Sequence, residues 1–175
     1  MTIKPRRAVL PGRFQPVHKG HIEVIKWALE RVDELIIVIG SAQESHTFEN
    51  PFTAGERMLM IREALREINV DFSRIYIVPV PDIQVNSIWV SYLRSLLPPF
   101  DTGISRNPLV IRLFREAGLR VLKPPVYSRS EYSGTRIREL MLAGAPWEEY
   151  VPKSVASIIK SLDGISRLRE VVKKE

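Results

Sequence analysis

A run of five consecutive aliphatic residues, Leu-Ile-Ile-Val-Ile at 35–39, constrains the fold of this chain more than any other feature. The run is too short for a membrane helix, and Gly40 ends it. An uninterrupted apolar run of this length is typical of a strand that is buried on both faces. Sheets with both faces buried are usually parallel, because the helices that connect their strands cover the faces. The run therefore predicts a parallel sheet inside a layer of helices.

Helical patterns alternate with such apolar runs along the chain. Ile22, Ile25 and Leu29 recur at helical spacing, and Thr53 with Glu56 predicts a capping box at the start of another helix. We expect strands at 8–10, 35–39, 75–80, 102–105 and 121–122, and helices at 22–32, 53–68, 89–97, 107–118, 133–141, 154–162 and 165–172. Strands separated by helices predict an α/β fold, an open parallel sheet with right-handed crossovers and helices on both faces.

The length of 175 residues predicts one domain, with an α/β core at 7–123 and a C-terminal loop and helices at 124–175. No apolar run reaches the roughly 18 residues of a membrane span. The basic N-terminus leads into a strand instead of a signal-peptide core, so we expect a cytoplasmic protein with no membrane partner. The absence of cysteine excludes disulfides and thiolate catalysis. A net charge of +6 favours an anionic partner, either a nucleotide or a nucleic acid.

The segment at 12–21, GRFQPVHKGH, connects the first expected strand to the first helix. Gly12 and Pro16 suit a tight turn, and the free amides and dipole of a helix start attract phosphate. His18 and His21 are three residues apart, so both rings should lie on one side of the first turn and donate hydrogen bonds to phosphate oxygens. We interpret the segment as a phosphate clamp. A plain helix cap, or half of a metal site completed by carboxylates, remains open at this point.

Ligands of open parallel sheets bind at the carboxyl ends of the strands, where the winding order reverses. We expect three loops to meet there, at 12–21, 40–51 and 81–89. The second loop carries His46, and Arg57 follows one turn into the next helix. The third loop carries Asp82, Asn86 and Trp89. An aromatic residue in this position either packs in the core or stacks on a flat heterocycle, and the sequence leaves both interpretations open.

A second candidate cradle for phosphate begins at Ser133, in the sequence SGTRIRELM. Ser133, Gly134 and Thr135 can present hydroxyls and backbone amides at a helix start, and Arg138 lies in the following turn. A serine at a helix start is also a common cap, so this element alone has low specificity. Together with the clamp near the start of the chain, it would enclose a triphosphate from two sides.

These residues match two known signatures. GRFQP followed by HKGH resembles the (H/T)xGH signature of the nucleotidyltransferase superfamily, and Ser133, Gly134, Thr135 and Arg138 resemble its (S/T)xTxxR element. More narrowly, the chain resembles the archaeal-type nicotinamide-nucleotide (NMN) adenylyltransferases over about residues 7–165, through the blocks GRFQPVHKGH, IGSAQESHTFENPFTAGER, NSIWVSY, PPFD and EYSGTRIRELM. The resemblance implies a Rossmann-like fold with a C-terminal helical extension, and a homo-oligomer, commonly a hexamer.

The resemblance also implies the reaction of ATP with NMN to give NAD and pyrophosphate, with a divalent metal such as Mg²⁺ and with ATP as co-substrate. It assigns the catalytic roles to Arg13, His18, His21 and Arg138. It assigns ATP binding to Gly12, Arg13, His18, His21, Ser133, Gly134, Thr135 and Arg138, with the adenine near the loop at 133–135. It assigns NMN binding to Phe14, Ser41, Gln43, His46, Asn86 and Trp89, and it names no protein ligand for the metal.

Two alternatives stay open. Another enzyme of the superfamily would transfer an adenylyl or cytidylyl group to pantetheine phosphate, FMN or a phosphorylated alcohol. A basic nucleic-acid-binding module is the alternative from another class, although the 26 Lys and Arg residues are scattered among 20 acidic ones. We expect small-molecule substrates and no nucleic-acid partner.

Overall fold

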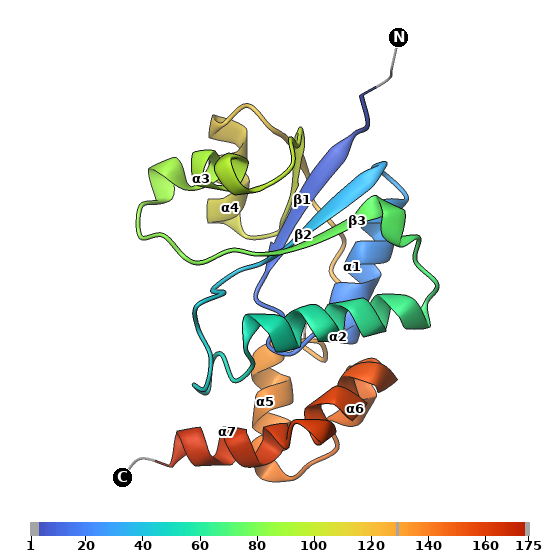
Figure 1. Ribbon diagram of the computed structural model, residues 1–175, viewed down its shortest axis with the longest axis vertical. Coiled ribbons are helices and arrows are strands. Elements are labelled where there is room, and N and C mark those ends of the chain that lie inside the picture. The colour runs from blue at the N-terminus through green and yellow to red at the C-terminus, as the bar shows by residue number, and fades with distance from the viewer. Residues whose placement is uncertain (1–3, 129, 174–175) are drawn as a thin grey trace.

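Five short strands form one parallel sheet in the part of the chain that this computed structural model describes, residues 4–128 and 130–173 (Figure 1). The strands lie in the order β3-β2-β1-β4-β5. Their bounds are Arg7–Gly12 (β1), Glu34–Ile39 (β2), Ile75–Pro79 (β3), Thr102–Ile104 (β4) and Arg120–Leu122 (β5). All five expected strands are present, so the predicted open parallel sheet is confirmed.

Helices connect the strands as the sequence predicts, and several of them begin at a side-chain cap. The helices are Lys19–Leu29 (α1), Ala54–Glu67 (α2), Trp89–Leu96 (α3), Pro108–Glu116 (α4), Gly134–Ala143 (α5), Lys153–Ser161 (α6) and Gly164–Val172 (α7). Thr53 and Glu56 form the expected capping box, and Asn107 caps α4. None of the helices in the described ranges is long and apolar enough to cross a membrane.

The apolar run in β2 is buried on both faces of the sheet. Leu35, Ile37 and Ile39 point to the face covered by α1, α2 and the C-terminal helices, whereas Ile36 and Val38 point to the face covered by α3 and α4. All five side chains are at most 2% exposed. Figure 1 shows α3 and α4 together on one side of the strands and α1 and α2 on the other. The run of residues 35–39 thus supplies both halves of the hydrophobic core.

The three C-terminal helices share the core of the first face. Ile137, Val155 and Leu168 are fully buried in the same cluster as the residues of α1 and α2. Arg167 in α7 donates two hydrogen bonds, of 2.7 and 2.9 Å, to the carboxylate of Glu56 at the start of α2. These contacts hold the C-terminal helices against α2 and against the core of that face. The division of the chain into a core at 7–123 and an extension at 124–175 stays a prediction.

The winding order of the sheet reverses beside β1. The chain passes from β1 to β2 and β3 on one side, and then returns to β4 and β5 on the other side. The connections that follow β1 and β4 lead to helices on opposite faces of the sheet. They therefore diverge at the carboxyl end of β1 and open a crevice, where ligands of such sheets bind. The fold therefore places the segment at 12–21 in that crevice.

Replacing Thr53 with alanine should lower the free energy of unfolding by about 1 kcal/mol, because the amide of Glu56 loses the hydroxyl that accepts its hydrogen bond. Urea denaturation measures this change. Thr53→Ser keeps the hydroxyl and is the matched control, which should remain close to the wild type. Equal stability of the alanine and serine variants would show that the cap does not stabilise α2.

Candidate functional site

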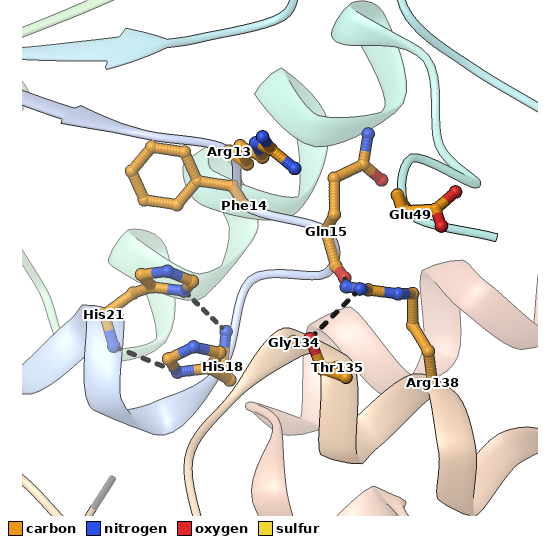
Figure 2. Close-up of a pocket in the computed structure, with 9 residues that line it drawn as sticks. All are labelled: Arg13, Phe14, Gln15, His18, His21, Glu49, Gly134, Thr135 and Arg138. Atoms are coloured by element: carbon orange, nitrogen blue, oxygen red, sulfur yellow. Dashed lines mark hydrogen bonds between the residues drawn. The ribbon is translucent and has the colours of Figure 1, made fainter. Parts of the chain in front are cut away.

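A cavity of about 250 Å³ lies between the segment that follows β1 and the start of α5 (Figure 2). Its lining consists of Arg13, Phe14, Gln15, His18, His21, Glu49, Gly134, Thr135 and Arg138. Residues from both predicted phosphate cradles therefore face one space, although about 110 positions separate them in the sequence. Gly12 and Ser133 precede lining residues directly, and Ser133 caps α5 by accepting a hydrogen bond from the amide of Arg136.

His18 and His21 hold each other through main-chain hydrogen bonds at the start of α1. The amide of His18 donates to Nδ1 of His21 at 3.1 Å, and the amide of His21 donates to Nδ1 of His18 at 3.3 Å. The two rings stack with centroids 3.6 Å apart. Because each Nδ1 accepts a hydrogen bond, the proton of each neutral ring resides on Nε2. The histidines thus cap the helix with one nitrogen and keep a donor on the other.

Both imidazoles are neutral at neutral pH. Burial lowers the pKa of His18 to about 4. Loss of hydration also lowers the pKa of His21 well below its usual value, and repulsion from the nearby His18 acts in the same direction. Each ring can therefore donate a hydrogen bond to an anion without carrying a charge. Within residues 4–128 and 130–173, no group of three or more His, Cys, Asp or Glu side chains could hold a metal ion.

Arg138 connects α5 to the segment after β1. Its Nη1 donates to the main-chain oxygen of Gln15 at 2.7 Å, and its Nη2 donates to Oγ1 of Thr135 at 3.3 Å (Figure 2). A Cβ atom at Gly134 would lie 2.9 Å from Nη1 of Arg138 and 3.0 Å from the oxygen of Gln15. The absence of a side chain at position 134 therefore lets the helix start approach the segment after β1 this closely.

The guanidinium of Arg138 has unused donor capacity inside the cavity. Arg138 is 7% exposed, and its Nε has no hydrogen-bond partner among the described residues. The pKa of Arg138 is lowered, and burial is the largest cause. The charge of Arg13 acts in the same direction, whereas the exposed carboxylate of Glu49 opposes it. A buried donor without a partner is costly, and an anionic oxygen in the cavity would satisfy it.

The tight turn after β1 depends on Phe14, whereas the sequence predicted that Gly12 would provide it. Phe14 has a positive φ of 55°, and Gly12 ends β1 in an extended conformation. A Cβ atom at Gly12 would lie 2.9 Å from the ring of Phe14, so the glycine makes room for that ring. Ser41 and His46 also have positive φ values, of 47° and 57°. Such strain tends to gather at functional sites.

The loops after β2 and β3 are joined by Asp82. Its carboxylate accepts hydrogen bonds from the amide of Ser41 at 3.2 Å and from Nε2 of Gln43 at 3.1 Å. The amide of Asp82 donates in return to Oε1 of Gln43 at 2.9 Å. Ser41 is buried, whereas Gln43 and His46 are exposed. The expected meeting of these two loops is therefore present.

Asn86 and Trp89 lie further along the β3 connection, at the start of α3. Asn86 is exposed. Trp89 is half-buried, and its ring lies 5.6 Å from the ring of Phe114 in the core beneath α3 and α4. Neither residue lines the cavity described above, and the same is true of Ser41, Gln43 and His46. Their assignment to NMN stays a prediction.

Sequence reasoning missed Gln15 and Glu49 as cavity residues. Gln15 is 2% exposed, and its side chain forms two hydrogen bonds, of 2.8 and 2.9 Å, with the main chain of Phe52. No spacing pattern marks Gln15, because its partner lies 37 positions away. Arg57 was expected near the site, and it is fully buried among main-chain oxygens instead of facing the cavity.

A family model described as cytidylyltransferase-like matches residues 9–140. A protein named nicotinamide-nucleotide adenylyltransferase from Ignicoccus hospitalis is 58% identical, over 97% of this chain and 99% of its own length. Proteins of the same name from Archaeoglobus fulgidus and Saccharolobus solfataricus are 57% and 54% identical, over 94% and 95% of this chain and 97% and 96% of their own lengths.

A solved structure has the same fold. It is a bifunctional NMN adenylyltransferase/ADP ribose pyrophosphatase from Francisella tularensis, complexed with AMP and a manganese ion. The TM-score is 0.80 at 25% sequence identity, and the match covers 95% of this chain. The match covers 52% of the Francisella chain, so the present chain corresponds to about half of that bifunctional protein.

The rings of His18 and His21 should remain neutral, with the proton on Nε2, well below neutral pH. Isotope-edited NMR of the imidazole nitrogens reports the tautomer, and the ring of His18 should not titrate until the pH approaches about 4. The unfolded chain binds the proton near pH 6.5, so the free energy of unfolding should fall as the pH drops from 6.5 toward 4. Titration of both rings near 6.5 would contradict the desolvated arrangement.

Proposed function

The chain belongs to the nicotinamide-nucleotide adenylyltransferase family, and from this premise we propose that it transfers the adenylyl group of ATP to NMN, giving NAD and pyrophosphate. One structural observation in this chain supports the proposed activity most directly. The neutral donors of His18 and His21 and the guanidinium of Arg138 share a single cavity. That arrangement suits a chain of phosphates bound from two sides.

The reaction needs alignment and charge stabilisation more than it needs a base. The second pKa of a nucleotide phosphate is about 6, so the phosphate of NMN is already largely ionised at neutral pH. One of its oxygens attacks the α-phosphorus of ATP directly, and the bond from that phosphorus to the pyrophosphate oxygen breaks. No proton has to be removed from the attacking group. The lowered pKa values of His18 and His21 agree with this, because neutral rings serve as donors to phosphate.

We assign the ATP phosphates to Arg13, His18, His21 and Arg138. The two guanidinium groups supply positive charge, and the Nε2 protons of the two rings supply neutral hydrogen bonds. The backbone amides of residues 133–135 lie at the start of α5, where the helix dipole favours an anion. The unpartnered Nε of Arg138 supports this assignment, since a phosphate oxygen would satisfy it.

An apolar recess beside His18 supports the predicted place of the adenine near the start of α5. Its volume is about 130 Å³, and aromatic or aliphatic side chains line most of it. The residues on its walls include Gly20, Val24, Val126, Tyr127 and Tyr132. The ring of Tyr132 is nearly parallel to that of His18, with centroids 6.5 Å apart. A flat heterocycle suits such a recess.

We place NMN on the other side, at the loops after β2 and β3. The acceptor phosphate must approach the α-phosphorus opposite the departing pyrophosphate, and β2 lies directly beside β1 in the sheet. The bonds from Asp82 to Ser41 and Gln43 hold these loops together. Phe14, Ser41, Gln43, His46, Asn86 and Trp89 are the residues that we assign to NMN.

We expect Mg²⁺ to arrive bound to ATP. The lining of the cavity offers one carboxylate, Glu49, and this donor set fits a cation that takes most of its ligands from phosphate and water. Bound in that way, Mg²⁺ would neutralise charge on the departing pyrophosphate. The homo-oligomer, the hexamer in particular, and the cytoplasmic location stay predictions.

The purified chain should form NAD from ATP and NMN in the presence of Mg²⁺. A panel of acceptors with ATP, scored by pyrophosphate release, tests the substrate class, and the panel includes pantetheine phosphate, FMN and phosphorylated alcohols. NMN should be used far better than these three. Faster release with any of them would reassign the enzyme within the superfamily, and no release with any acceptor would reject adenylyl transfer.

Replacing His21 with asparagine should lower kcat by about 10² to 10³, which is the usual cost of removing one preorganised donor to developing charge. Asparagine retains an acceptor near the position of Nδ1, which bonds the amide of His18, but it lacks the Nε2 proton. The unfolding midpoint should therefore change little. Steady-state kinetics and urea denaturation measure the two effects, and normal turnover by His21→Asn would remove this ring from the phosphate site.

A further inference from the structure

Arg57 is a fully buried charged side chain that touches main-chain oxygens from separate segments. Its exposed fraction is 0%. Nη1 donates to the oxygens of Arg13 and Gly40, both at 2.8 Å, and Nη2 donates to the oxygen of Ser41 at 3.0 Å. Nε donates to the oxygen of Thr53 at 3.2 Å. All three nitrogens of the guanidinium are thus used to hold the backbone.

The oxygens that Arg57 binds belong to the two loops that flank the proposed reaction. Arg13 lies in the segment after β1, where we place the ATP phosphates. Gly40 and Ser41 begin the loop after β2, where we place NMN. The amide of Gly40 also donates to the oxygen of Gly12 at 2.8 Å, so the two loops are in contact at this point. One planar group therefore spans the junction between the two substrate loops.

The forked guanidinium of arginine is well suited to hold the main chain on both sides of this junction. It presents five donors in a fixed plane, so it can hold oxygens on both sides of a junction at set distances. Burying it has a cost, which is visible as a lowering of its pKa to about 10 by desolvation, against the opposing influence of Asp82 and Glu56. The group still carries its charge at neutral pH.

We infer that Arg57 is a positioning residue, which fixes the distance between the segment that holds the ATP phosphates and the loop that holds the acceptor. The inference rests on the proposed function. In a direct displacement between two bound anions, a misplacement of about 1 Å is enough to cost about 10²-fold in rate. Each loop keeps its own ligand contacts when Arg57 is changed, whereas the alignment between the loops is lost.

The chain offers a matched control in Arg74, which forms the same kind of contact elsewhere. Its guanidinium donates to the main-chain oxygens of Leu29, Val32 and Asp33 at 2.6, 2.7 and 2.8 Å. These oxygens lie between α1 and β2, at the amino end of the strand. Arg74 therefore ties backbone segments together without touching either substrate loop.

The test compares Arg57→Lys with Arg74→Lys in the full chain. Lysine keeps the charge and loses the fork, so both variants should unfold at lower urea concentration than the wild type. We expect kcat of Arg57→Lys to fall by about 10²-fold while KM for ATP and for NMN changes by less than about threefold. We expect Arg74→Lys to retain the wild-type kcat. If Arg57→Lys does not fold, Arg57→Gln, which keeps two N–H donors, is measured in the same way.

The outcomes separate the inference from the proposed function. If the wild type makes no NAD from ATP and NMN, the proposed function fails whatever the variants do. If the wild type is active and both arginine variants lose stability without losing kcat, Arg57 is merely structural and the inference is overturned. A rise in KM for one substrate at unchanged kcat would also overturn it, since Arg57 would then serve one loop alone.

Discussion

The hydrogen bond between Arg138 and the main-chain oxygen of Gln15 joins parts of the chain that are 123 positions apart, and the site depends on it. Glycine at position 134 leaves room for it, because a Cβ atom there would crowd both partners. The same hydrogen bond requires Gln15 to stay in place, which its side chain achieves by pairing with the main chain of Phe52. The cavity is therefore defined by buried polar contacts to the backbone, with the hydrophobic core of the sheet as their support.

The candidate site combines neutral and positively charged hydrogen-bond donors. His18 and His21 lose their charge through burial and gain a fixed tautomer from the backbone, whereas Arg13 and Arg138 carry the positive charge. Four full charges in one small cavity would repel one another before a ligand arrived. Neutral rings add hydrogen bonds without adding to that repulsion. The stacked histidines are thus suited to bind polyphosphate beside two arginines.

The fold was predictable because its determinants are local. The aliphatic run at 35–39 and the Thr53 cap can each be recognised within a few consecutive residues, and both were identified from the sequence. The meeting of the two predicted phosphate cradles in one cavity was also predictable, since each segment has its own signature. The contacts of Gln15 and Arg57 were not predictable, because their partners are main-chain atoms of distant segments. Every residue type supplies such atoms, so the sequence does not indicate which ones are bound. The positive φ of Phe14 likewise follows from tertiary packing over Gly12.

The position of Arg138 has a consequence for biosynthesis. The five strands are all encoded before residue 123, whereas α5, which carries Arg138, is encoded after them. A nascent chain therefore contains all five strands before the residues that α5 contributes to the cavity have been translated. The cavity can form only after α5 has emerged, so its assembly follows the synthesis of the sheet strands.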